Sequence, residues 1–138
     1  MSQASILVVE DEPRISKVVS EILRRAGYAV TEARGVAEAR KVLALAEVPF
    51  KLIVCDVVLP DESGAALAED ANRLCFSSKV LLISGLPFDM LEDRSFLTAD
   101  ILLSGRIFYR QKPFSQGELL SEVDRILNTK VRLADAAY

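Results

Sequence analysis

Histidine and tryptophan are absent from the 138 residues of this chain, and only two residues are cysteine. Without histidine the chain has no Ser-His-Asp or Cys-His nucleophile system, carries no phosphohistidine and builds no histidine-rich zinc site. The cysteines, Cys55 and Cys75, form neither a CxxC pair nor the dense framework of a small secreted domain, so we expect two buried thiols in a reducing cytoplasm. Any chemistry must therefore use carboxylate, lysine, hydroxyl or thiol groups.

A long apolar run and an excess of basic residues are missing too. No charge-free stretch exceeds nine residues, the length of Val80 to Phe88, whereas a helix needs about 20 residues to cross a bilayer. The 17 Lys and Arg against 20 Asp and Glu give a net charge of −3, which argues against a protein that binds the nucleic-acid backbone. Hydrophobic residues make up 51% of the chain, enough for the core of one globular domain. We expect a cytoplasmic protein with no membrane insertion and no nucleic-acid partner.

Short apolar runs alternate five times with stretches of helical period. This order is typical of an α/β fold in which helices cover both faces of a parallel sheet. The expected strands are Ser5–Val9, Tyr28–Ala33, Leu52–Cys55, Lys79–Ile83 and Arg106–Arg110. The expected helices run from Pro13 to Ala26, from Val36 to Ala46, from Ser63 or Gly64 to Leu74, from Phe96 to Leu103, and from a capping box at Ser115 and Glu118 to about Leu127.

The segment from Leu86 to Gly105 is the least regular part of this pattern. Pro87 and the nearby acids, Asp89 among them, predict a loop or a broken first turn before the helix that begins at Phe96. We expect one domain over residues 1–128. The ten residues of 129–138 then form a C-terminal tail, with no output domain.

Polar side chains follow four of the five predicted strands. Glu10 and Asp11 come after the first strand, Asp56 after the third, Ser84 after the fourth and Lys112 shortly after the fifth. Ligands of an open parallel α/β sheet bind beyond the carboxyl ends of its strands. If these strands are neighbours, three carboxylates, one hydroxyl and one ammonium group meet in one cleft.

Each of these residues also has an ordinary structural explanation. Glu10 and Asp11 could cap the first helix, Asp56 could begin a turn, Ser84 could cap, and Lys112 could be a solvated surface lysine. These separate explanations do not account for three carboxylates in one cleft, because two like charges about 4 Å apart repel by roughly 4 kcal/mol at an effective dielectric near 20. A bound Mg²⁺, which prefers carboxylate, water and phosphate oxygens, explains the convergence. A carboxylate beside the metal can then attack phosphorus and form an aspartyl phosphate.

At these residues the chain resembles the receiver domain of two-component response regulators, the CheY-like superfamily. The resemblance runs from about Ser5 to Asn128 and is carried by four segments in order: ILVVEDEP, LIVCDVVLPDESG, LLISG and YRQKPF. It implies a flavodoxin-like doubly wound five-stranded parallel sheet of order 2-1-3-4-5 with five helices. The stretch between Ser84 and Lys112 is several residues longer than the family's usual spacing, so we expect an atypical region after the fourth strand.

Carried over position by position, the resemblance makes Asp56 the phosphorylated residue. It makes Asp11 a direct ligand of Mg²⁺, Glu10 the residue that holds a metal-bound water, and Asp56 and the main-chain carbonyl of Val58 further metal ligands. Lys112, Ser84 and Gly85 are expected at the phosphate. A cis peptide bond is expected between Lys112 and Pro113.

The resemblance further makes Ser84 and Tyr109 the switch residues. Tyr109 lies three residues before Lys112, where the family keeps an aromatic that changes rotamer as the hydroxyl residue moves toward the phosphate. The structural alternative is a half-buried strand aromatic, since its neighbour Phe108 is expected to face the core.

The function implied is a phosphoacceptor receiver domain without an effector domain. It would take phosphate from a histidine kinase or a histidine phosphotransfer protein and change its binding to a downstream effector protein, rather than act as an enzyme on external substrates. Two alternatives remain at this stage. One is a receiver-like module that binds its partner constitutively. The other is an aspartyl-nucleophile, metal-dependent phosphatase, a class that usually has a second Asp where this chain has Val58.

Overall fold

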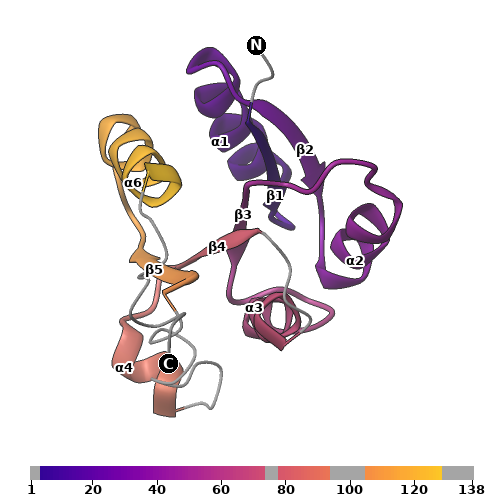
Figure 1. Cartoon of the computed structure of the whole chain (residues 1–138). Coiled ribbons are helices and arrows are strands. Elements are labelled where there is room, and N and C mark those ends of the chain that lie inside the picture. The colour runs from indigo at the N-terminus through magenta and orange to yellow at the C-terminus, as the bar shows by residue number, and fades with distance from the viewer. Residues whose placement is uncertain (1–3, 74–77, 94–104, 129–138) are drawn as a thin grey trace, which may run out of the picture.

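The computed structural model describes residues 4–73, 78–93 and 105–128, and its centre is a five-stranded parallel sheet (Figure 1). The strand order is β2-β1-β3-β4-β5, which confirms the predicted topology. The strands are β1 (Ser5–Val9), β2 (Ala29–Ala33), β3 (Leu52–Asp56), β4 (Lys79–Ser84) and β5 (Ile107–Gln111). The helices are α1 (Pro13–Arg25), α2 (Val36–Leu45), α3 (Gly64–Arg73), α4 (Phe88–Asp93) and α6 (Gln116–Asn128).

The core consists of two apolar layers, one on each face of the sheet. In β3, Ile53 and Cys55 face the layer that packs against α2 and α3, while Leu52 and Val54 face the layer shared with α1 and α6. Figure 1 shows α1 and α6 on one side of the sheet and α2 and α3 on the other. Because both faces are covered, the central strands are continuous apolar runs, as in other all-parallel sheets. The parallel pairing also brings all five carboxyl ends to one edge.

Local sequence signals account for both ends of α1 and for the start of α6. Helix α1 begins at Pro13 and is followed by Gly27, whose φ of 100° is the left-handed conformation that glycine adopts freely. The predicted capping box of α6 is present, since Glu118 N–H donates to Ser115 Oγ at 3.1 Å and Ser115 N–H donates to Glu118 Oε1 at 3.0 Å.

The region after β4 differs from the prediction. A short helix, α4, occupies the place where a loop or a broken first turn was expected. The physical reason is that proline and acidic residues also mark helix starts: Met90 N–H donates to the Pro87 carbonyl at 3.1 Å, and Asp89 lies in the first turn. The expected helix at Phe96–Leu103 and the second cysteine, Cys75, lie outside the described residues.

Among the residues that the structure describes, no helix has both the length and the apolar character needed to cross a membrane. The described thiol, Cys55, is buried and free of any disulfide.

Replacing Leu52 by alanine should lower the free energy of unfolding by about 2–5 kcal/mol, because the change removes buried apolar surface and leaves a cavity in the central strand. Leu52 is fully buried, whereas Leu45 is 82% exposed, so Leu45→Ala is a matched control that should stay within about 0.5 kcal/mol of the wild type. Urea unfolding followed by circular dichroism measures both. Equal losses at the two positions would contradict the assignment of the core.

Candidate functional site

Three carboxylates meet at the carboxyl edge of the sheet. Val9, the last residue of β1, is in register with Cys55 of β3, so the residues that follow lie side by side. One carboxylate oxygen each of Glu10, Asp11 and Asp56 lies within 4.8 Å of the others. The structure therefore brings together the three acids that the sequence singled out. We call them the acid cluster.

Lys112 directly follows β5, the edge strand two places from β3, and its side chain reaches back to the acid cluster. Its main-chain N–H donates to the Ser84 carbonyl at 2.7 Å, which extends the pairing of β4 and β5 by one residue. Its Nζ lies 3.1 Å from Asp56 Oδ2 and 3.3 Å from Glu10 Oε1. The peptide bond between Lys112 and Pro113 is cis. One ammonium group thus contacts two of the three carboxylates.

Burial makes this cluster of charges costly. Glu10 is 2% exposed and Asp56 is 8% exposed. Burial, followed by the hydrogen bond with Asp56 and its charge, raises the pKa of Glu10 from 4.5 to about 7, although Lys112 opposes the shift. Burial alone would lower the pKa of Lys112, but the carboxylates of Asp56 and Glu10 outweigh it and raise that pKa.

The acid cluster fits a divalent cation on two independent grounds. Three carboxylates meet there, and among the described residues the Lys112 ammonium group pairs with Glu10 and Asp56 but not with Asp11. In addition, Glu10 Oε2 is buried and has no hydrogen-bond partner within the described part of the chain. A buried carboxylate oxygen without a partner is costly, and a hard cation or its bound water removes that cost.

The loop after β3 passes close to Asp56. Val58 N–H donates to Asp56 Oδ1 at 3.1 Å, while the Val58 side chain points partly to solvent and is 50% exposed. At the end of the loop, a Cβ on Gly64 would lie 2.1 Å from the main-chain oxygen of Asp56, so only glycine fits there. The sequence indicated Gly64 only as a helix start. Its close approach to the Asp56 main chain could not be predicted from the sequence.

Ser84 and Tyr109 are joined through Leu86. Ser84 Oγ accepts a hydrogen bond from Leu86 N–H at 3.1 Å, and the Tyr109 hydroxyl donates to the Leu86 carbonyl. The Tyr109 ring packs against Phe88 of α4, with ring centroids 5.7 Å apart, and burial raises the pKa of its hydroxyl. Next to Ser84, a Cβ on Gly85 would meet no atom of the described residues within 4 Å, so they leave this side of the site open.

Phe108 lies on the opposite face of β5 from Tyr109. It packs with the α1 and α6 layer, where the Arg125 guanidinium lies 5.5 Å from its ring centroid, while Tyr109 packs with the other layer. The two neighbouring aromatic side chains therefore pack on opposite faces of the sheet, and Tyr109 is the one beside Ser84.

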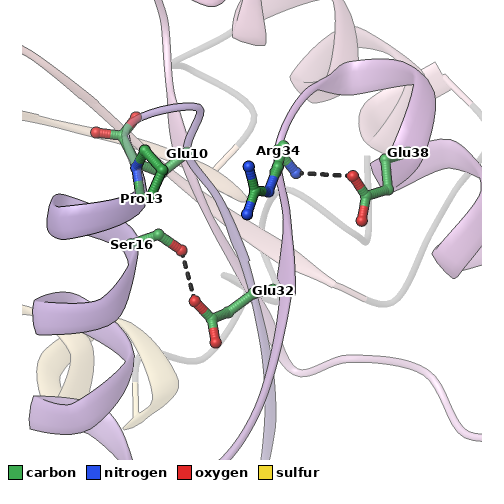
Figure 2. A pocket seen from close by; sticks show the side chains of 6 residues that line it. All are labelled: Glu10, Pro13, Ser16, Glu32, Arg34 and Glu38. Carbon is green, nitrogen blue, oxygen red and sulfur yellow. Dashed lines mark hydrogen bonds between the residues drawn. The ribbon is translucent and has the colours of Figure 1, made fainter.

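A cavity of about 220 Å³ adjoins the acid cluster, and the sequence did not predict it. Figure 2 shows how the end of β1, the start of α1 and the segment from β2 to α2 surround it. Ser16 Oγ donates to Glu32 Oε1 at 2.7 Å on one wall, and Arg34 N–H donates to Glu38 Oε2 at 3.2 Å on another. Helical period marked Ser16 only as part of α1, since a contact with a residue 16 positions away leaves no local signal.

The fold and the acid cluster define a doubly wound α/β protein with a candidate cation site at the carboxyl edge of its sheet. The family described as response regulator receiver domain matches residues 6–124. The chain belongs to this family of two-component signalling proteins.

Three similar proteins illustrate the match. PetR of Rhodobacter capsulatus is 35% identical over 126 residues, which are 91% of this chain and 49% of PetR, so the chain spans about half the length of that relative. The response regulator receiver protein CpdR of Brucella abortus is 30% identical over 88% of this chain and 95% of its own length. The crystal structure of the response regulator TrrA from Thermotoga maritima, in complex with Mg²⁺-BeF, is 27% identical, covers 90% of this chain and 99% of TrrA, and superposes with a TM-score of 0.74.

Without divalent cations, the contribution of Glu10 to stability should fall as pH rises from about 4.5 to about 7. The folded state keeps a proton on Glu10 up to about pH 7, whereas the unfolded chain releases it near 4.5, so the folded state binds more protons in this window. The contribution is complete below the lower pKa and lost above the upper one.

Urea unfolding of the wild type and of Glu10→Gln at several pH values measures this effect. Because glutamine does not titrate, the stability of the wild type relative to the variant should fall by at most about 1.4 kcal/mol per pH unit across the window. The exposed Glu12, changed to glutamine in the same way, is the control. A relative stability that rises with pH would contradict the raised pKa of Glu10.

Proposed function

We propose that the chain is a receiver domain that is phosphorylated on Asp56 and thereby changes its binding to another protein. One observation carries the proposal: the nearly buried carboxylate of Asp56 has the Lys112 ammonium group 3.1 Å from one oxygen and shares a cluster with Glu10 and Asp11. A carboxylate in this setting is placed to attack phosphorus, while the neighbouring charges stabilise the phosphoryl oxygens.

The reaction balances as a transfer of one phosphoryl group. A carboxylate oxygen of Asp56 forms the new bond to phosphorus, the bond between phosphorus and the donor's imidazole nitrogen breaks, and the electron pair leaves with that nitrogen. The donor is proposed to be a histidine kinase or a histidine phosphotransfer protein. This is consistent with the lack of histidine in these 138 residues, since the phosphohistidine that donates the group then lies outside them.

Receiver domains bind Mg²⁺ at their acidic site, and the groups proposed to hold it here are Asp11, Asp56 and the Val58 carbonyl as direct ligands and Glu10 through a metal-bound water. When bound, the ion neutralises charge on the phosphoryl oxygens. The unpartnered oxygen of Glu10 supports this ligand set, and so does the similarity to TrrA, which was solved with Mg²⁺-BeF.

Lys112, Ser84 and Gly85 are proposed to receive the phosphoryl oxygens. Lys112 already lies beside Asp56, the Ser84 hydroxyl belongs to the adjacent strand, and Gly85 leaves open space next to it. Ser84 and Tyr109 are proposed as the switch, because both are bonded to Leu86. The output is proposed to be contact with a separate effector protein in the cytoplasm. CpdR, which this chain matches over 95% of the relative's length, shows that a similar receiver protein can be about as long as the receiver domain itself.

Asp56→Asn should abolish phosphorylation. The full chain is incubated with Mg²⁺ and a small-molecule phosphodonor such as acetyl phosphate, and intact-mass spectrometry follows an acid-stable, hydroxylamine-labile mass increase. Asparagine lacks the nucleophilic carboxylate, so the labile adduct should be lost completely.

Asp124→Asn, which removes the same charge from the exposed face of α6, is the control and should be phosphorylated like the wild type. A labile adduct that persists in Asp56→Asn would contradict the assignment of the phosphoacceptor. A wild type that turns over a phosphate ester catalytically would favour the phosphatase alternative.

Tyr109→Ala should uncouple the surface at α4 from the phosphorylation of Asp56, since the variant loses both the bond to Leu86 and the ring contact with Phe88. Hydrogen–deuterium exchange of residues 86–90 with and without phosphodonor measures the coupling. The wild type should change its exchange rates on phosphorylation, and the variant should become phosphorylated with at least a severalfold smaller change. Phe108→Ala, on the other face of β5, should keep the wild-type response.

A further inference from the structure

The N-terminus of α2 is capped by a residue from a different loop. Its own N-cap residue is Gly35, which has no side chain to accept a hydrogen bond. Asp61, in the loop between β3 and α3, takes that role: Oδ1 accepts from Val36 N–H at 3.3 Å and Oδ2 accepts from Ala37 N–H at 3.0 Å. A carboxylate at this position satisfies free amide groups and faces the positive end of the helix.

Gly35 is required by the approach of Asp61 and not by its backbone conformation. Its φ of −164° is ordinary extended backbone, open to any residue. A Cβ at this position, however, would lie 2.8 Å from Asp61 Oδ1 and 2.9 Å from Oδ2. The hydrogen bonds donated by these main-chain amides, that of Ala37 first, also lower the pKa of the Asp61 carboxyl group. The glycine and the carboxylate therefore form a matched pair across two loops.

Arg40 of α2 forms an ion pair with Glu62, the residue that follows Asp61 in the same loop. Its guanidinium group lies 2.8 Å from Glu62 Oε2 and 2.9 Å from Asp70 Oδ2, and so bridges α2 to the loop and to α3. These side chains are partly exposed, and a single pair of this kind contributes little to stability. Two consecutive residues of the loop, Asp61 and Glu62, therefore both contact α2.

The anchored loop is the one that follows the phosphoacceptor. Val57 N–H donates to the Ile83 carbonyl at 2.9 Å and Gly64 N–H donates to the Val57 carbonyl at 2.8 Å, so both ends of the loop are pinned at the sheet edge. Val58, whose carbonyl is a proposed metal ligand, lies just inside this closure and three residues before Asp61. The position of that carbonyl therefore depends on where the tip of the loop is held.

We propose that Asp61 is a positioning residue for the cation site: by capping α2 it fixes the loop that carries the Val58 carbonyl, and it thereby increases the affinity of the acid cluster for Mg²⁺. This inference rests on the proposed Mg²⁺ site. It adds a residue that touches neither metal nor phosphate and acts through the backbone of its own loop.

Mg²⁺ titration of the full chain by isothermal titration calorimetry tests the proposal with three variants. Asp61→Ala removes the cap, Asp61→Asn keeps one acceptor oxygen but no charge, and Gly35→Ala keeps the charge but displaces the carboxylate. Asp61→Ala and Gly35→Ala should each weaken Mg²⁺ binding by about fivefold, the size of a typical N-cap effect, with Asp61→Asn between them and the wild type. Gly117→Ala in α6, where a Cβ meets only Ser115 Oγ at 3.9 Å, should bind like the wild type.

Two further readouts separate positioning from a loss of stability. Phosphorylation of Asp61→Ala by a small phosphodonor should be slow at limiting Mg²⁺ and return to the wild-type rate at saturating Mg²⁺. By reciprocity of linked equilibria, Mg²⁺ should slow hydrogen exchange of the Val36 and Ala37 amides in the wild type. Thermal unfolding by circular dichroism establishes that each variant is folded.

The outcomes are distinct from those that test the proposed function. If wild-type protein neither binds Mg²⁺ nor is phosphorylated on Asp56, the proposed function fails. If the wild type does both and folded Gly35→Ala binds Mg²⁺ like the wild type, the role of Asp61 is overturned. The role of Asp61 is overturned as well if Asp61→Ala and Asp61→Asn weaken Mg²⁺ binding equally and added salt removes the loss. That result would show that only the negative charge of Asp61 matters, and not its hydrogen bonds to α2. Unchanged exchange at Val36 and Ala37 on adding Mg²⁺ would also contradict it.

Discussion

The repulsion among three carboxylates at one edge of the sheet is the constraint on which the rest of this structure depends. Two of them, Glu10 and Asp56, are almost fully buried, and the Lys112 ammonium group contacts only those two. At an effective dielectric near 20, each pair of like charges about 4 Å apart costs roughly 4 kcal/mol. A fold tolerates this cost only if the strands hold the three acids rigidly and something positive can enter. Burial first, and then the neighbouring Asp56, raise the pKa of Glu10 to about 7, so that a proton can take the place of the missing positive charge.

Apolar packing on both faces of the sheet holds the strand ends in place. Every residue of β3 is buried, and the alternate side chains of the central strands enter two separate layers, so the strand ends cannot shift without disturbing both. Gly64 contributes from the loop side, because the absence of a Cβ lets α3 begin directly against the main chain of Asp56. The position of Asp56, the proposed phosphoacceptor, therefore depends on the core as much as on the site.

The residues at the strand ends could be predicted because their signals are local. A short apolar run followed by an acid, a hydroxyl or a lysine places that side chain at the carboxyl edge, whatever the rest of the chain does. Asp61 could not be found in this way, because it caps a helix 24 and 25 positions earlier in the chain. The Ser16–Glu32 wall of the cavity was missed for the same reason. Helix α4 could not be predicted for a different reason: Pro87 and Asp89 are as typical of a loop as of a helix start, and here the Pro87 carbonyl accepts a hydrogen bond from the Met90 amide and the helix forms.

Leu86 links Ser84 and Tyr109, the two residues proposed as the switch. Its N–H donates to the Ser84 hydroxyl, and its carbonyl accepts from the Tyr109 hydroxyl. A phosphoryl group on Asp56 that draws the Ser84 hydroxyl toward itself takes away the acceptor of the Leu86 N–H. The backbone that holds Tyr109 must then adjust, because an unpaired amide in this partly buried turn is costly. Serine and tyrosine therefore cannot respond independently. The Tyr109 ring contacts Phe88, the first residue of α4, so in the proposed switch this adjustment would reach the surface through a helix that begins two residues after Leu86.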